Sequence, residues 1–200
     1  MKRDGPPAAS RKSKPPQEGD NTMARKQVSR RQTRTLSNKE LLAVAAQQGA
    51  LRAKVIAAPS VETGHWVRWK CQFGCDGFGS SLVCPPHSPT PAETRAMLDQ
   101  YQRAVLFETP PGQAKTIAVR LEREVFLAGY YKAFGLGAGP CSLCDTCAFD
   151  QGCRHAEEAR PSMEACGIDV FATVRKHGFT LNVVRNHSDP QHYFGVVLVE

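Results

Sequence analysis

The chain has 200 residues, of which 41% are hydrophobic and 22% are charged, and its formal net charge is +7. This length fits one folded domain with an extension. No apolar run approaches the roughly 18–20 residues that cross a bilayer, and residues 1–7 lack the apolar segment of a secretory signal. The composition therefore argues against a membrane-spanning or secreted protein, and we expect a cytoplasmic one.

The excess of positive charge is confined to the N-terminal stretch. Residues 1–35 contain ten Lys or Arg and three Asp or Glu, whereas residues 36–200 contain sixteen of each kind. The first stretch also has almost no large apolar side chains, so it cannot bury enough surface to offset its ordering entropy. We predict a disordered basic tail over residues 1–36 and a folded domain over residues 37–200. Because the domain carries no net charge, we do not expect it to bind nucleic acid.

Capping signals and hydrophobic periodicity predict both helices and strands in the domain. Ser37 followed by Glu40 is a capping-box pattern, and Gly49 is placed to end the helix that it begins. The other predicted elements are, in chain order, strands over 54–58 and 65–70, a helix over 92–102, a strand over 104–108, helices over 115–134 and 170–177 (the second capped by Asp169), and strands over 180–185 and 193–199. Helices and strands do not alternate in a βαβ rhythm. We therefore predict an α+β fold, a mostly antiparallel sheet covered by helices, with two cysteine-rich metal loops.

Three polar or glycine-rich patterns receive a structural interpretation. The glycine motif over 135–139 follows a helix rather than a strand, so we interpret it as a flexible exit into a loop and not as a phosphate site. Arg160 and Glu164 are four residues apart and are predicted to pair on a helix surface. The histidines and aspartate of the segment 186–192 are interpreted as part of a polar turn between two strands.

The chain contains eight cysteines. In a reducing compartment, clustered cysteines indicate metal ligands rather than disulfides. Every cysteine is a candidate ligand of a metal or cofactor: Cys71, Cys75, Cys84, Cys141, Cys144, Cys147, Cys153 and Cys166.

The second cysteine region has the spacing C-x2-C-x2-C-x5-C, from Cys141 through Cys144 and Cys147 to Cys153. The first two gaps match the bacterial ferredoxin run, whose cysteines hold iron–sulfur clusters. The third gap is longer than in that run, and Arg154 stands where ferredoxins have proline. Cys153 can therefore serve this centre or a second one.

The first cysteine region supplies three thiols, from Cys71, Cys75 and Cys84, with several glycines between them. Glycine lets the backbone approach closely and direct N–H groups at sulfur, and such hydrogen bonds tune the potential of a cluster. A fourth ligand has to come from elsewhere, and Cys153 and Cys166 are the candidates. We favour Cys153 for the second region, because a short gap closes locally, and Cys166 for the first.

The favoured cofactor is an iron–sulfur centre of the 4Fe–4S type, in one cluster or two. Structural zinc is the alternative, since zinc takes sites of four thiolates, but two successive C-x2 steps are unusual around one tetrahedral ion. The leading hypothesis is an electron-transfer protein that serves an unidentified redox partner protein. The alternatives are a zinc-stabilised interaction module and an enzyme with one open iron. Whether the chain is an enzyme stays undecided, and no catalytic residue is assigned.

Several strings of residues resemble a prokaryotic family of predicted metal-binding proteins. They are Cys84-Pro85-Pro86, Gly129-Tyr130-Tyr131-Lys132-Ala133-Phe134, Gly139-Pro140-Cys141, Cys153-Arg154-His155 and the specific stretch 160–170. The resemblance covers roughly residues 40–200 and excludes the tail. It implies metal binding through the seven cysteines from 71 to 153. Ala156 replaces the proline that usually follows Cys-Arg-His in the family, which leaves the implied ligands intact.

Deletion of residues 1–35 tests the predicted tail. We expect the truncated protein to keep its metal content and its melting temperature, because a segment that does not pack contributes little to the free energy of unfolding. Metal analysis and thermal unfolding of the full-length and truncated chains measure both quantities. A large fall in either one would contradict the predicted division of the chain.

Overall fold

The computed structural model describes residues 35–186 and 188–200, so most of the predicted basic tail, residues 1–34, lies outside the described residues. The described part contains five α-helices and four strands, which confirms the predicted α+β class. No helix of this part is both long enough and apolar enough to cross a bilayer.

The four strands form one antiparallel sheet in the order β1-β2-β4-β3. β2 (Arg103–Thr109) lies between β1 (Arg52–Ala57) and β4 (Tyr193–Leu198), and β4 also pairs with the short strand β3 (Phe134–Leu136). The C-terminal strand is therefore central in the sheet, although it is the last element of the chain.

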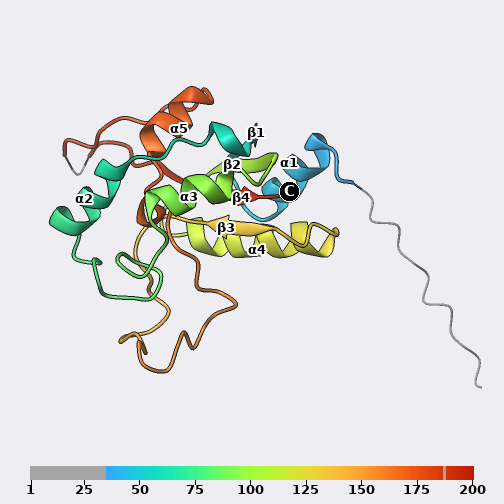
Figure 1. Cartoon of the computed structure of the whole chain (residues 1–200). Coiled ribbons are helices and arrows are strands. Elements are labelled where there is room, and N and C mark those ends of the chain that lie inside the picture. The colour runs from blue at the N-terminus through green and yellow to red at the C-terminus, as the bar shows by residue number, and fades with distance from the viewer. Residues whose placement is uncertain (1–34, 187) are drawn as a thin grey trace, which may run out of the picture. The chain divides into compact units, whose positions relative to one another are not determined.

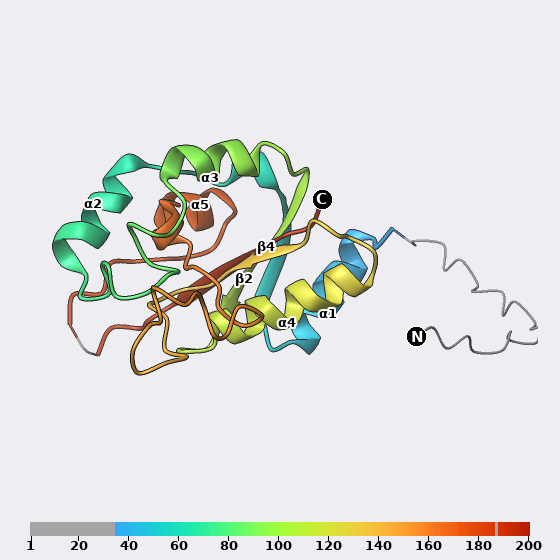
Figure 2. The same cartoon turned by 60° about the horizontal axis from the view of Figure 1, so that its bottom comes forward.

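Helices cover both faces of the sheet (Figures 1 and 2). α1 (Asn38–Gln47) and α4 (Ala114–Leu127) pack on one face, and α3 (Pro91–Leu98) and α5 (Val170–Lys176) pack on the other. Successive residues of β2 and β4 alternate between the two apolar clusters formed in this way. A strand that is covered on both faces has apolar residues at successive positions. Both central strands have such a run, so both could be predicted from the sequence.

The predicted caps at two helix starts are present. The Ser37 side chain accepts a hydrogen bond from the Glu40 N–H, and the Glu40 carboxylate accepts one from the Ser37 N–H in return. Asp169 caps α5 by accepting a hydrogen bond from the Ala172 N–H at 2.9 Å. Both contacts satisfy backbone donors that lack a partner in the first turn of a helix.

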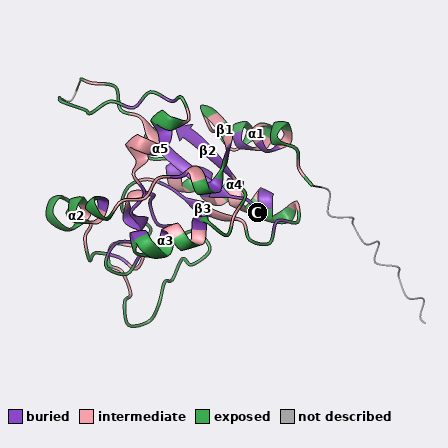
Figure 3. Cartoon of the chain, turned by 45° about the horizontal axis from the view of Figure 1, so that its top comes forward, coloured by how far each residue is buried: buried purple, intermediate pink, exposed green. Residues whose placement is uncertain are grey.

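The prediction of a strand over 65–70 is wrong, because the segment is the start of helix α2 (His65–Gly74). Val67 is buried, and Cys71, four residues later, lies on the same side. Trp69 and Phe73 are 65% and 80% exposed, and most of α2 is exposed in Figure 3. Aromatic and β-branched residues favour strands only where a sheet is available to pack on, and in the described part of the chain α2 packs mainly on α3 and the 3-10 helix over 164–166.

The strand predicted over 180–185 is also wrong, because the segment has no regular structure. The Leu181 carbonyl accepts hydrogen bonds from the Arg175 guanidinium of α5, the shorter at 2.6 Å, rather than from a strand. Val183 and Val184 are 65% and 45% exposed. The segment is therefore an irregular stretch in which Leu181 packs into the core while the two valines lie at the surface.

The helix predicted over 115–134 is shorter in the structure, where α4 ends at Leu127. The glycine motif after it does not form the flexible connection that we predicted. Gly129, with φ at +108°, turns the chain after α4, and β3 then begins within the range predicted as helix. Gly135 packs so tightly on α4 that an added Cβ would lie 2.9 Å from the Ala118 carbonyl oxygen. Glycine serves close packing here, which single-sequence periodicity does not reveal.

Arg160 does not pair with Glu164. Its guanidinium instead forms two hydrogen bonds of 2.7 Å with the two carboxylate oxygens of Glu122 on α4. Both side chains are largely buried, at 13% and 14% exposure. The i,i+4 rule holds only on a helix, and Arg160 lies in an irregular stretch, where the ion pair fastens the end of the second cysteine region to α4.

Candidate metal centres

The second cysteine region forms one irregular loop between β3 and the segment that leads to α5 (Figures 1 and 2). All four of its thiols, those of Cys141, Cys144, Cys147 and Cys153, line one cavity of about 240 Å3. The Arg154 guanidinium donates a hydrogen bond of 2.7 Å to the Thr146 carbonyl, which draws the end of the loop back towards its centre. Cys153 thus lines the same cavity as the other three cysteines of its region, and its assignment to this centre stays a prediction.

The first cysteine region combines the end of α2 with the loop that follows. Cys71 lies on α2, Cys75 is its C-terminal cap, and Cys84 is 6% exposed in the loop. All three line a second cavity, of about 860 Å3. The Gly77 N–H donates to the Cys75 sulfur at 3.4 Å, as the glycine content of this region led us to expect. Burial, followed by the charge of Cys75, raises the pKa of the Cys71 thiol.

The two cysteine regions contact each other. The Leu82 N–H, in the first region, donates a hydrogen bond of 3.4 Å to the sulfur of Cys147, in the second. Residues 80–83 line the smaller cavity, while the next two residues, Cys84 and Pro85, line the larger one. One short loop therefore forms part of the wall of both cavities.

One lysine of α4 has a buried side-chain amine. Lys115, in the first turn of α4, has an Nζ atom that is shielded from solvent and has no hydrogen-bond partner among the described residues. Burial lowers the pKa of Lys115, while the thiols of Cys141 and Cys84 and the carboxyl of Glu164 oppose the shift. The Oε2 atom of Glu164 is also buried and unpartnered, and burial raises the pKa of this carboxyl.

Buried polar atoms are usually hydrogen-bonded, so orphaned ones need an explanation. A metal centre held by several thiolates carries net negative charge, and a buried ammonium beside thiols from both sets is complementary to such a group. The soft sulfur donors and the unpaired cation thus fit an anionic iron–sulfur or zinc centre. Lys115 was not among the predicted site residues, because no local pattern distinguishes it from other lysines on a helix.

Cys166 is separate from the other seven cysteines. It lies in a short 3-10 helix (Glu164–Cys166), is 1% exposed and belongs to the apolar cluster between the sheet and α5. It lines neither cysteine cavity. Burial raises the pKa of its thiol to about 12. The described residues therefore bring three cysteines, not four, to the larger cavity.

The thiols of each set share a cavity without converging on one point. Within the described ranges, no three His, Cys, Asp or Glu side chains are grouped closely enough to hold a metal ion. Of the histidines, His155 lines the smaller cavity, and His192 lines the larger one with its Nδ1 atom 2.6 Å from Glu108. His187 lies outside the described residues.

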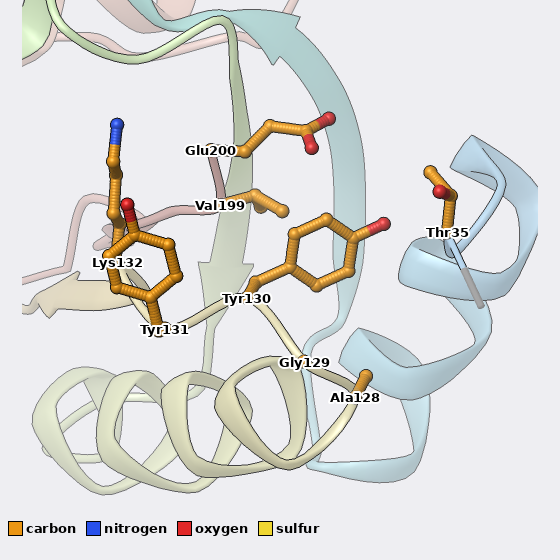
Figure 4. A pocket seen from close by; sticks show the side chains of 8 residues that line it. All are labelled: Thr35, Ala128, Gly129, Tyr130, Tyr131, Lys132, Val199 and Glu200. Atoms are coloured by element: carbon orange, nitrogen blue, oxygen red, sulfur yellow. The ribbon is translucent and has the colours of Figure 1, made fainter. Parts of the chain in front are cut away.

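A third cavity, of about 310 Å3, contains no cysteine (Figure 4). Tyr130, Lys132 and Glu200 are among its lining residues. The Tyr130 hydroxyl accepts hydrogen bonds from the Leu36 N–H at 2.6 Å and from the Arg103 guanidinium at 3.1 Å. These contacts fasten the segment before α1 to the sheet, so we interpret the third cavity as structural.

Comparison with protein families matches residues 54–199 to the family described as predicted metal-binding protein (DUF2284). The chain belongs to this family. Its matched range contains both cysteine regions and all four strands except the start of β1. Membership confirms the resemblance seen in the sequence and supports metal binding, without specifying the metal. Comparisons with curated proteins and with solved structures gave no match.

Proposed function

We propose that this protein is an iron–sulfur electron carrier with two centres. One would be held by the four thiols of the second cysteine region, and the other by Cys71, Cys75 and Cys84. The observation that carries the proposal is the division of seven cysteines between two cavities that share one short loop. Clusters bound by thiolates exchange single electrons, and the chain supplies burial and hydrogen bonds that set their potential.

The surroundings of the thiols support a redox role over a purely structural one. N–H groups point at the sulfurs of Cys75 and Cys147, and Lys115 adds a buried positive charge near both sets. Each of these contacts stabilises the more negative, reduced state of a centre and so raises its potential. An electron carrier also needs a redox partner protein, which is part of the proposal.

The position of Cys166 favours a second candidate function, an enzyme with one open iron. With three thiols in the larger cavity, a cubane there would keep one iron without a protein thiolate. That cavity is much larger than the one beside the second set, with a volume of about 860 Å3 against about 240 Å3. The three-thiol set would then bind a substrate, while the four-thiol set would supply electrons.

Metal and sulfide analysis tests the proposal directly. We expect protein purified without oxygen to be brown, to absorb broadly near about 400 nm and to contain iron and acid-labile sulfide in similar amounts. For this test the protein has to be expressed with ample iron in the medium. A colourless protein with stoichiometric zinc, obtained under the same condition, would overturn the proposal and support the zinc-stabilised module instead.

A further inference from the structure

The cavity beside the first cysteine set is large and mostly apolar. Its volume of about 860 Å3 lies in the range typical of pockets that enclose a small organic molecule, roughly 300–1,000 Å3. α2, the loop after it, α5 and the segment before β4 all contribute to its wall. The apolar side chains of this wall include Trp66, Phe78, Phe171, Val183 and Phe194.

Besides the thiols, the charged groups of the wall are one lysine, two carboxylates and one histidine. Asp169 caps α5, His192 contacts Glu108, and the unpartnered Oε2 of Glu164 is shielded from solvent. Lys70 is exposed and forms no hydrogen bond or ion pair with the described residues. Asp169 and His192 are partly exposed but each already has a partner, so Lys70 is the exposed charged side chain of the wall that has none among the described residues.

We propose that this cavity binds an apolar small molecule with one anionic group, whose apolar body lies against the wall and whose anion lies at Lys70. A preformed apolar pocket with few polar groups is typical of ligand sites, and the unpaired cation determines the charge of the ligand. Cys71 and Cys75 belong to the same wall, so the bound molecule would lie beside the first thiol set. The inference concerns binding and does not depend on which metal the thiols hold.

Fluorescence of 8-anilinonaphthalene-1-sulfonate, an apolar anion, tests the site in the full-length protein. The chain has two tryptophans, Trp66 and Trp69, and both lie on α2, so energy transfer from tryptophan to the probe reports binding, and a cavity variant locates it. Ala138 lines the cavity and is partly exposed. We expect Ala138→Phe to weaken probe binding about tenfold by occupying the space.

Ala128→Phe is the matched control, because Ala128 is also partly exposed but lines the third cavity (Figure 4). It is expected to leave probe binding unchanged. Equal probe binding in the wild type and in Ala138→Phe would show adsorption elsewhere on the surface and would overturn the proposal. Circular dichroism of both variants checks that the enlarged side chains are accommodated.

The role of Lys70 is tested with a charged and an uncharged probe. Lys70→Gln is expected to weaken the binding of 8-anilinonaphthalene-1-sulfonate about two- to fivefold, because an exposed ion pair contributes little to affinity. Binding of N-phenyl-1-naphthylamine, which has the same rings without the sulfonate, should not change. An equal loss for both probes, or for neither, would overturn the assignment of the anion to Lys70.

Both probe tests use the full-length protein as purified. Their outcome bears on binding at the larger cavity, whereas the iron content bears only on the proposed electron carrier.

Discussion

Replacing Cys144 with serine is expected to remove about half of the bound iron and sulfide and to leave the rest in place, if thiolates hold two similar clusters. Cys144 lies in the middle of the second region and lines the smaller cavity with three other thiols. The first set lies in a different cavity, so its centre should keep its spectrum. Iron, sulfide and absorption measurements on protein purified without oxygen check this result. Full retention of iron would show that Cys144 and the other thiols of the smaller cavity do not hold a cluster together.

Cys166→Ala is the matched cysteine control. Because Cys166 is buried in the apolar cluster and lines neither cavity, the variant is expected to keep all of its iron. It should unfold more easily, by about 1–2 kcal/mol, since a small buried group is lost from a packed core. Loss of one centre would instead identify Cys166 as the fourth ligand of the first set, which is the assignment favoured from the sequence.

Gly167→Ala is expected to lower the free energy of unfolding by about 2–4 kcal/mol, from an unfavourable positive φ and a steric clash. Gly167 ends the 3-10 helix of Cys166 with φ at +74°, and an added Cβ would lie 2.7 Å from Cβ and 3.0 Å from Cα of Pro91. The proline ring at the start of α3 cannot rotate away. The melting temperature should fall by roughly 5–15 °C for a chain of this length, as calorimetry would measure.

Gly112→Ala separates the clash from the backbone strain. Gly112 has the same φ of +74°, but an added Cβ would meet nothing within 4 Å. We expect this variant to lose only about 1 kcal/mol, the cost of the left-handed conformation alone. If both alanine variants lost the same stability, the contact between Gly167 and Pro91 would not be a tight one. The difference between the two variants measures that contact.

Features that depend on neighbouring residues were predictable from the sequence. The capping box of Ser37 and Glu40 and the cap at Asp169 each act within one helical turn. The central strands β2 and β4 were predictable because burial on both faces leaves a continuous apolar run. The spacing of the second cysteine region brought its four thiols to one cavity, since short gaps close locally.

The sequence by itself determined the α+β class, membership of a metal-binding family and two cysteine regions, all of which rest on local patterns. Only the tertiary structure decided that 65–70 is helical, that Cys166 lies in the core, and that the Nζ atom of Lys115 is shielded from solvent. It also paired Arg160 with Glu122 instead of Glu164. These outcomes depend on side chains that are distant in sequence and meet only after the sheet and its helices have packed, so no periodicity or spacing along the chain encodes them.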